Sequence, residues 1–94
     1  MPISFDQNVR VTPDTLINIV GEESVLLNLK SESYYGLDEV GTRMWTALTT
    51  SDSIEAAYEM LLAEYKISAE VLQGDLQALL EKLIKRGLVT VGNG

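Results

Sequence analysis

One stretch decides the fold: Tyr34-Tyr35-Gly36-Leu37-Asp38-Glu39-Val40-Gly41-Thr42-Arg43-Met44-Trp45, in which an aromatic strand gives way to a helix. Up to Leu37 the residues are of strand type, and beyond Asp38 the apolar positions follow helical spacing. The side chain of Asp38 can accept hydrogen bonds from the amides of the opening helical turn, which predicts that it is the N-cap. The chain is therefore expected to change from sheet to helix at one defined residue.

Two more strands are predicted upstream. β-Branched and aliphatic residues run from 16 to 20 and from 24 to 29, on either side of the turn Gly21-Glu22-Glu23. With residues 33–37 they predict a three-stranded antiparallel meander. Residues 3–14 are predicted to form a short extended arm that ends in a turn. A sheet this small needs a helical cover.

Three helices are predicted after the sheet. The first begins at the N-cap described above, and the second begins after Asp52, which stands three residues before Glu55 as in a capping box. The third begins after Ser68 and ends at Gly87, where the following residue can pack back onto the helix as in a Schellman ending. Residues 88–91 are expected to add a short extended tail.

The third helix has a wide apolar face. Its buried centre is predicted to contain Leu72, Leu76, Leu79 and Leu83. One shoulder carries Val71, Asp75, Ala78 and Lys82, and the other carries Leu80 and Ile84. Two interpretations remain open: the face packs against both the sheet and the first two helices, or one shoulder borders a groove beside the third strand. Such a groove could accept a peptide as an added strand.

Composition predicts a folded α+β protein and narrows its function. In 94 residues, 46% are hydrophobic and two are prolines, so residues 1–94 are expected to form a single domain. A three-stranded antiparallel sheet followed by three helices has the outline of a winged helix-turn-helix, which often binds DNA. A net charge of −7 disfavours that function, and the basic cluster Lys82, Lys85 and Arg86 is explained by the negative end of the helix dipole.

Enzymatic functions are disfavoured by the residue types present. Histidine and cysteine are absent, which excludes imidazole and thiolate catalysis and the usual zinc ligands. The pairs Glu22-Glu23 and Asp38-Glu39 are explained by a turn and by helix capping. Gly36 and Gly41 lack the spacing of a phosphate loop. We therefore predict no catalytic residue, metal or cofactor, and, without an export signal or a membrane span, a cytoplasmic location.

The sequence also resembles the PqqD-like family of precursor-peptide recognition proteins. The resemblance rests on Val25-Leu26-Leu27-Asn28-Leu29, a short polar turn, the stretch from Tyr34 to Trp45, and residues 79–89 as a closing helix and exit. It covers roughly residues 5 to 91. Its most specific part is the run aromatic, aromatic, Gly, Leu, Asp or Asn, any residue, Val or Thr, Gly.

The resemblance implies a non-enzymatic module that binds the leader segment of a ribosomally synthesised precursor peptide and presents it to modifying enzymes. The leader pairs with the third strand and lies against the third helix. The implied peptide-binding residues are Ser33, Tyr34, Tyr35, Gly36, Leu37, Val71, Asp75, Leu79 and Lys82. Asp75 and Lys82 are candidates for selecting charged leader residues.

The resemblance leaves the pathway open. Similar stand-alone domains serve lasso-peptide maturation, with a leader peptidase and a cyclase, which is the pathway we favour. Others serve as peptide chaperones for a radical SAM enzyme, as in the biosynthesis of the cofactor PQQ. A different class of function is a homodimerisation module, because an exposed edge strand can pair with a copy of itself. Salt-sensitive binding to duplex DNA would instead indicate a transcriptional regulator.

Overall fold

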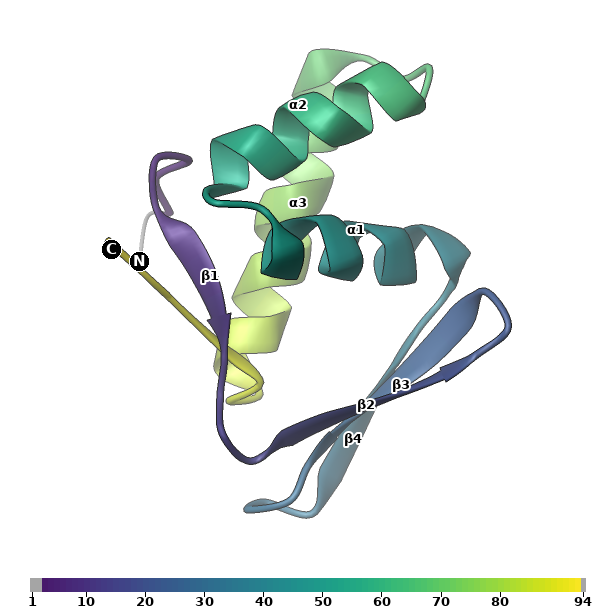
Figure 1. Cartoon of the computed structure of the whole chain (residues 1–94), viewed down its shortest axis with the longest axis vertical. Coiled ribbons are helices and arrows are strands. Elements are labelled where there is room, and N and C mark those ends of the chain that lie inside the picture. The colour runs from purple at the N-terminus through teal and green to yellow at the C-terminus, as the bar shows by residue number, and fades with distance from the viewer. Residues whose placement is uncertain (1–2, 94) are drawn as a thin grey trace.

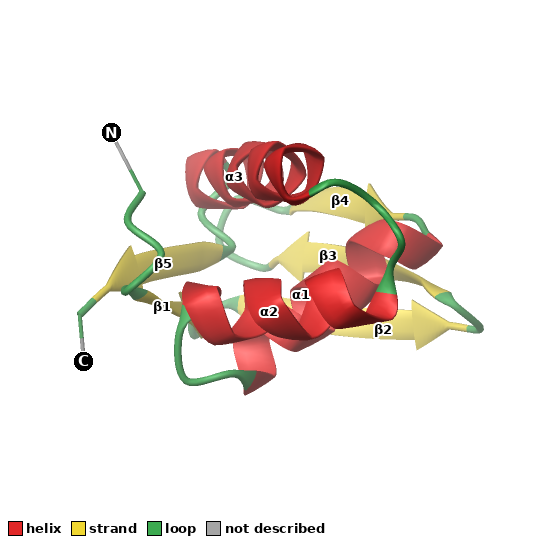
Figure 2. Ribbon diagram, turned by 90° about the horizontal axis from the view of Figure 1, so that it is seen from above, coloured by secondary structure: helices red, strands yellow, loops and turns green. Residues whose placement is uncertain are grey.

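The computed structural model describes residues 3–93 and confirms the predicted α+β class. In chain order the elements are β1 (Asn8–Val11), β2 (Thr15–Val20), β3 (Glu23–Asn28), β4 (Ser33–Leu37), α1 (Glu39–Thr50), α2 (Ile54–Glu64), α3 (Ala69–Lys85) and β5 (Val89–Gly92). Strands β2, β3 and β4 form an antiparallel sheet in that order, and the three helices follow it in the chain. Helix α1 lies across one face of this sheet, and α3 runs beside β4 (Figures 1 and 2).

The extended arm and the extended tail pair with each other, which the sequence did not predict. Strands β1 and β5 form a separate two-stranded antiparallel sheet, with Val9 opposite Val91. Val9 and Val89 are both buried in the core. The hydroxyl group of Thr15 donates a hydrogen bond to the carbonyl oxygen of Leu88 at 3.1 Å. The two ends of the fold are therefore joined to each other by this pair of strands.

Strand alternation gives the three-stranded sheet a helix-facing side and an outer side. On β3, Ser24, Leu26 and Asn28 are buried on the helix-facing side. Their partners on β4 are Leu37, Tyr35 and Ser33, and directly paired residues point to the same side of a sheet. Tyr34 and Gly36 therefore belong to the outer side.

The two tyrosines of β4 divide as strand alternation predicts. Tyr34 is 73% exposed, whereas Tyr35 is partly buried and packs against the core. The guanidinium of Arg86 lies 4.8 Å from the centre of the Tyr35 ring, a cation–π contact. Tyr35 is thus held in place from the side of α3, while the ring of Tyr34 is free to meet a partner.

The buried centre of α3 differs by one residue from the prediction. Leu72, Leu76 and Leu83 are fully buried as expected, but Leu80 takes the place assigned to Leu79. Leu79 is half-buried at the margin of the core. Adjacent residues on a helix lie ~100° apart, so the pattern of leucines alone allowed either of the two to face the centre.

The N-caps of α1 and α3 are confirmed, and that of α2 is corrected. An oxygen of Asp38 accepts a hydrogen bond from the amide of Gly41 at 2.8 Å, and Ser68 caps α3 through the amide of Val71. At α2, the cap is Ser53, whose hydroxyl oxygen accepts from the amide of Ala56 at 3.1 Å. The predicted cap, Asp52, precedes it by one residue and lies outside the helix.

The end of α3 has the predicted Schellman geometry. Gly87 has a φ of 71°, in the left-handed region that favours glycine. The amide of Leu88 donates to the carbonyl oxygen of Leu83 at 2.9 Å, and the amide of Gly87 donates to that of Ile84 at 3.0 Å. Leu88 is consequently returned to the core, where it is 2% exposed. This ending directs the chain into β5.

Candidate functional site

Strand β4 forms one edge of the sheet, and the hydrogen bonding shows which of its backbone groups face outward. The amide of Leu29 donates to the carbonyl oxygen of Asp14 at 2.9 Å, so the backbone of Leu29 faces β2. Along a strand, alternate residues face opposite neighbours. On β3, the residues that face β4 are therefore Ser24, Leu26 and Asn28.

The strand register then shows in which direction each backbone N–H and C=O group of β4 points. Ser33, Tyr35 and Leu37 lie opposite those three residues and exchange their backbone hydrogen bonds with β3. The N–H and C=O groups of Tyr34 and Gly36 consequently point away from the sheet, toward the open edge. Each residue offers one donor and one acceptor, so this edge presents a short template for another strand.

A hollow of about 260 Å³ lies on the helix-facing side of this edge. It is lined by Tyr35, Asp38, Val40, Gly41, Met44, Asp75, Ala78, Leu79 and Lys82. Figure 2 shows α3 beside β4, so the hollow has a strand on one side and a helix on the other. The structure thus brings Asp75 and Lys82, predicted from the sequence, next to Tyr35, and it shows that their shoulder of α3 borders the groove.

The remaining predicted residues have different positions. Ser33, Tyr34, Gly36 and Leu37 supply the strand beside the hollow. Val71 is 52% exposed on α3, one turn before the first α3 residue of the hollow, and does not line it. Toward Val71, the candidate site therefore consists of the surface of α3 alone.

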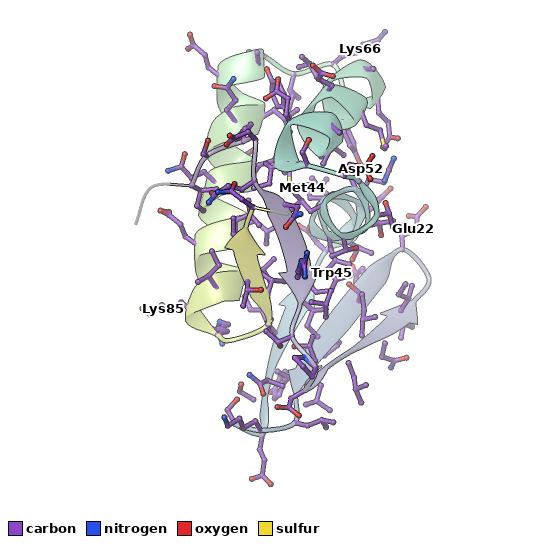
Figure 3. All side chains as sticks on the ribbon, turned by 60° about the vertical axis from the view of Figure 1, so that its left-hand side comes forward. Glu22, Met44, Trp45, Asp52, Lys66 and Lys85 are labelled. Atoms are coloured by element: carbon purple, nitrogen blue, oxygen red, sulfur yellow. The ribbon has the colours of Figure 1, made fainter. Side chains whose placement is uncertain are left out.

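Helix α1 adds two side chains, Val40 and Met44, that were not among the residues predicted to bind a peptide. Val40 is 45% exposed and Met44 is buried, and both line the hollow. Figure 3 shows Met44 and Trp45 inside the protein, with Glu22, Asp52, Lys66 and Lys85 on its outside. The helical spacing of Val40 and Met44 was visible in the sequence, but nothing there marked this end of the stripe as open. The two side chains therefore add apolar surface to the hollow.

The charged groups near α1 have structural roles. The guanidinium of Arg43 donates to both carboxylate oxygens of Glu64, at 2.8 and 2.9 Å, and joins α1 to α2. This hydrogen bonding lowers the pKa of Glu64 and raises that of Arg43. A carboxylate whose pKa is lowered stays ionised at neutral pH and is poorly suited to proton transfer there. Among residues 3–93, no cluster of three acidic side chains is arranged to hold a metal ion.

A larger hollow of about 620 Å³ lies on the opposite side of α3. Ile84 on the helix and Val89 and Val91 on β5 contribute to its lining. None of the residues predicted to bind a peptide lines it. Volume alone therefore does not identify the site, and the sequence pattern and the open edge both indicate β4.

In the described part of the chain, no helix has the length and apolar character needed to cross a membrane.

Comparisons with known proteins identify a family and two similar structures. The sequence matches the protein family described as coenzyme PQQ synthesis protein D (PqqD) over residues 23–89, which include β4 and α3. Curated proteins gave no significant match.

Two solved structures have the same fold. One is described as TbiB1 in complex with the TbiA(beta) leader peptide; it has 29% sequence identity and a TM-score of 0.80, covering 85% of this chain and 93% of that one. The other, a lasso peptide synthetase B1 complexed with the leader peptide, has 22% identity and a TM-score of 0.79, covering 88% and 98%. The second similarity is evidence of fold alone.

Proposed function

The chain belongs to the PqqD family, and on that premise we propose that it is a non-catalytic protein that binds the leader of a ribosomally synthesised precursor peptide by β-strand addition. The observation that carries the proposal is the open edge of β4 beside a hollow walled by α3, whose lining combines apolar side chains with Asp38, Asp75 and Lys82. We treat residues 1–94 as one recognition domain. Because precursor peptides are made on ribosomes, we place the protein in the cytoplasm.

Backbone pairing supplies the affinity in this proposal. The outward N–H and C=O groups of Tyr34 and Gly36 offer two donors and two acceptors to an added strand. Each intermolecular bond contributes about 0.5–1.5 kcal/mol net, because bonds to water are lost when it forms. Ser33 and Leu37 flank these positions and set the length of the template.

Side chains on the helix-facing side supply the selectivity. The leader residue between the two bonded positions lies opposite Tyr35 and points toward α3. There it meets the apolar surface of Leu79, with Asp75 and Lys82 close by. Exposed charges contribute little individually, so the two charged groups adjust a preference that the apolar surface sets. Val71 extends the same shoulder and is the outermost contact that we propose.

We favour lasso-peptide maturation as the pathway. The support is the 29% identity to TbiB1, whose structure contains the TbiA(beta) leader peptide. In this role the protein presents the leader to a leader peptidase and a cyclase. The description of the matching family instead supports a peptide chaperone for a radical SAM enzyme in PQQ biosynthesis. Both roles use the same edge of β4, and a short peptide gene beside the gene for one of these enzymes would decide between them.

Amide hydrogen exchange measured by NMR tests the binding mode at single residues. The amides of Tyr34 and Gly36 should exchange rapidly in the free protein, because they face solvent. Addition of the TbiA(beta) leader peptide should slow both. The amides of Ser33, Tyr35 and Leu37 are already bonded to β3 and provide an internal control.

Two results would contradict the proposal. One is protection of the opposite edge, on β2, without protection of Tyr34 and Gly36. The other is protection of β4 in the absence of any peptide, at concentrations where light scattering shows a dimer; this would support the homodimerisation module.

A further inference from the structure

Gly36 occupies a place in β4 where neither the backbone conformation nor a neighbour among residues 3–93 calls for glycine. Its φ does not lie in the left-handed region, in contrast to Gly21 and Gly87. A Cβ atom added to Gly36 would have no neighbour within 4 Å. Glycine within a strand costs roughly 0.5–1 kcal/mol relative to alanine, so the free protein would be more stable with a side chain here. Close approach of a ligand or of another backbone is one use of glycine within a strand, and it fits this position.

Over Gly36, on the outer side of the sheet, there is a separate hollow of about 340 Å³. Val25 lies directly opposite Gly36 in the register and is 40% exposed, and Val20 is 67% exposed. These two side chains give the hollow an apolar floor. It shares Asp38 with the hollow beside α3, whereas Val20, Val25 and Gly36 belong to the outer side of the sheet.

The rim of this hollow is acidic. Glu23 and Asp38 both line it. Ser24 pairs with Leu37, so one step further along the register Glu23 and Asp38 become neighbours on the outer side. None of the residues that line the hollow is basic. An apolar floor that ends at two carboxylates suits a side chain with a long aliphatic stem and a cationic end.

We propose that this hollow is a second side-chain subsite, which takes an arginine or lysine from the leader residue that pairs with Gly36. The inference rests on the proposed function. When a strand adds to β4, the residue opposite Gly36 points to the outer side, because directly paired residues share a side. Its stem lies over Gly36 against Val25, and its charge lies between Glu23 and Asp38. Glycine leaves the space that the stem fills.

Peptide display provides the test, since the natural leader is not needed. A surface-displayed library of random twelve-residue peptides is sorted for binding to the full chain and to the variant Gly36→Val. The wild-type selection should converge on peptides that share one arginine or lysine. Changing that residue to methionine, which keeps the length and removes the charge, should weaken binding about fivefold, the upper range for an exposed ion pair.

Two variants connect this cation to the hollow. In Glu23→Gln, the same change to methionine should cost only about twofold, since one of the two carboxylates is lost. Gly36→Val fills the hollow with a residue that strands favour, so it should fold with unchanged or higher stability and lose the preference for the cation.

The possible outcomes distinguish failure of the proposed subsite from failure of the proposed function on which it rests. Selected peptides that slow exchange at Tyr34 and Gly36, but show no cation that responds to Glu23→Gln or Gly36→Val, would refute the subsite and leave the proposed function standing. If no peptide is selected, or if selected peptides leave β4 unprotected, both are refuted.

Discussion

Replacing Tyr34 with proline should abolish most of the affinity for a leader and leave the fold nearly intact. The amide of Tyr34 faces the open edge of β4, so its loss removes no hydrogen bond within the sheet. The side chain is 73% exposed and contributes little packing. Proline is tolerated on edge strands where the missing N–H would face solvent. We expect a loss of unfolding free energy on the order of 1 kcal/mol or less, mainly from the restricted φ.

The effect on binding should be larger. In an antiparallel pair, the leader residue opposite Tyr34 exchanges two hydrogen bonds with it. Proline removes the donor, and its ring occupies the place where the leader backbone must approach. The loss of both bonds, at about 1 kcal/mol each, weakens binding by about 2 kcal/mol, or roughly 30-fold. Fluorescence anisotropy with a labelled TbiA(beta) leader peptide measures the affinity, and thermal unfolding measures the stability.

The other edge of the sheet offers a matched control. Leu16, Asn18 and Val20 of β2 have the register positions that bond to β3, so the amide of Ile19 faces outward on the far edge. Ile19→Pro therefore makes the same change at an equivalent position without touching β4. It should leave the affinity within about twofold of that of the unmodified protein, since surface substitutions far from a site change energies by about 0.5 kcal/mol or less.

Two results would refute the reasoning. If Ile19→Pro weakens binding as much as the β4 variant does, the effect is one of general stability. If Tyr34→Ala, which keeps the amide, weakens binding as much as Tyr34→Pro, the side chain and not the backbone carries the affinity.

Three further predictions concern the fold. Gly74→Ala should raise the unfolding free energy by about 0.5–1 kcal/mol, because the added Cβ meets open space within a helix. Gly41→Ala should give no gain, because its Cβ would lie 3.2 Å from side-chain atoms of the preceding turn. Urea unfolding compares the two variants. Ser53→Ala should cost about 1 kcal/mol and Asp52→Ala much less, and equal losses in urea unfolding would contradict the assigned N-cap. Glu64→Gln should lower the melting temperature at pH 7, because a carboxyl group whose pKa is lowered in the folded state stabilises the protein above the pKa that it has in the unfolded state. The difference in melting temperature between variant and unmodified protein should fade as the pH falls below about 4. A difference that persists at pH 2 would contradict the ion pair.

Local signals predicted the start of α1 and the end of α3, because each of these helix ends is determined by a few neighbouring residues. Asp38 and Gly87 are the residue types that those positions require, and both have the expected geometry. The start of α2 was missed by one residue because Asp52 and Ser53 are both good N-caps. The local sequence cannot choose between them, and the packing of Ile54 in the core fixes the register.

Long-range features were beyond the sequence pattern. The pairing of β1 with β5 places Val9 opposite Val91. Neither short segment alternates apolar and polar residues clearly enough for the sequence to predict which strand it pairs with. The candidate site was partly predictable: the pattern pointed to the third strand and the third helix, and the structure places residues of both around one hollow. Which backbone groups of β4 face outward depends on the bond between Leu29 and Asp14, which only the register reveals.

Under the proposed function, the joint between β4 and α1 is what keeps the unpaired edge in place for a partner strand. The hydroxyl groups of Ser24 and Thr42 lie 2.8 Å apart in a buried hydrogen bond, so β3 is tied to α1 across the end of β4. Gly41 packs closely against Leu37, and Asp38 caps the helix that follows. These contacts hold one side of β4, while its outer edge has no backbone hydrogen bond to any of residues 3–93.

A flexible leader loses conformational freedom when it pairs, so any ordering of the receptor would add to that cost. A strand held rigidly by the adjoining helix avoids the additional cost. The stretch from Tyr34 to Trp45 thus combines both requirements of strand addition: its helical half fixes the strand, and its strand half leaves the backbone of Tyr34 and Gly36 available. Loosening the joint, without any change in β4 itself, should therefore weaken leader binding.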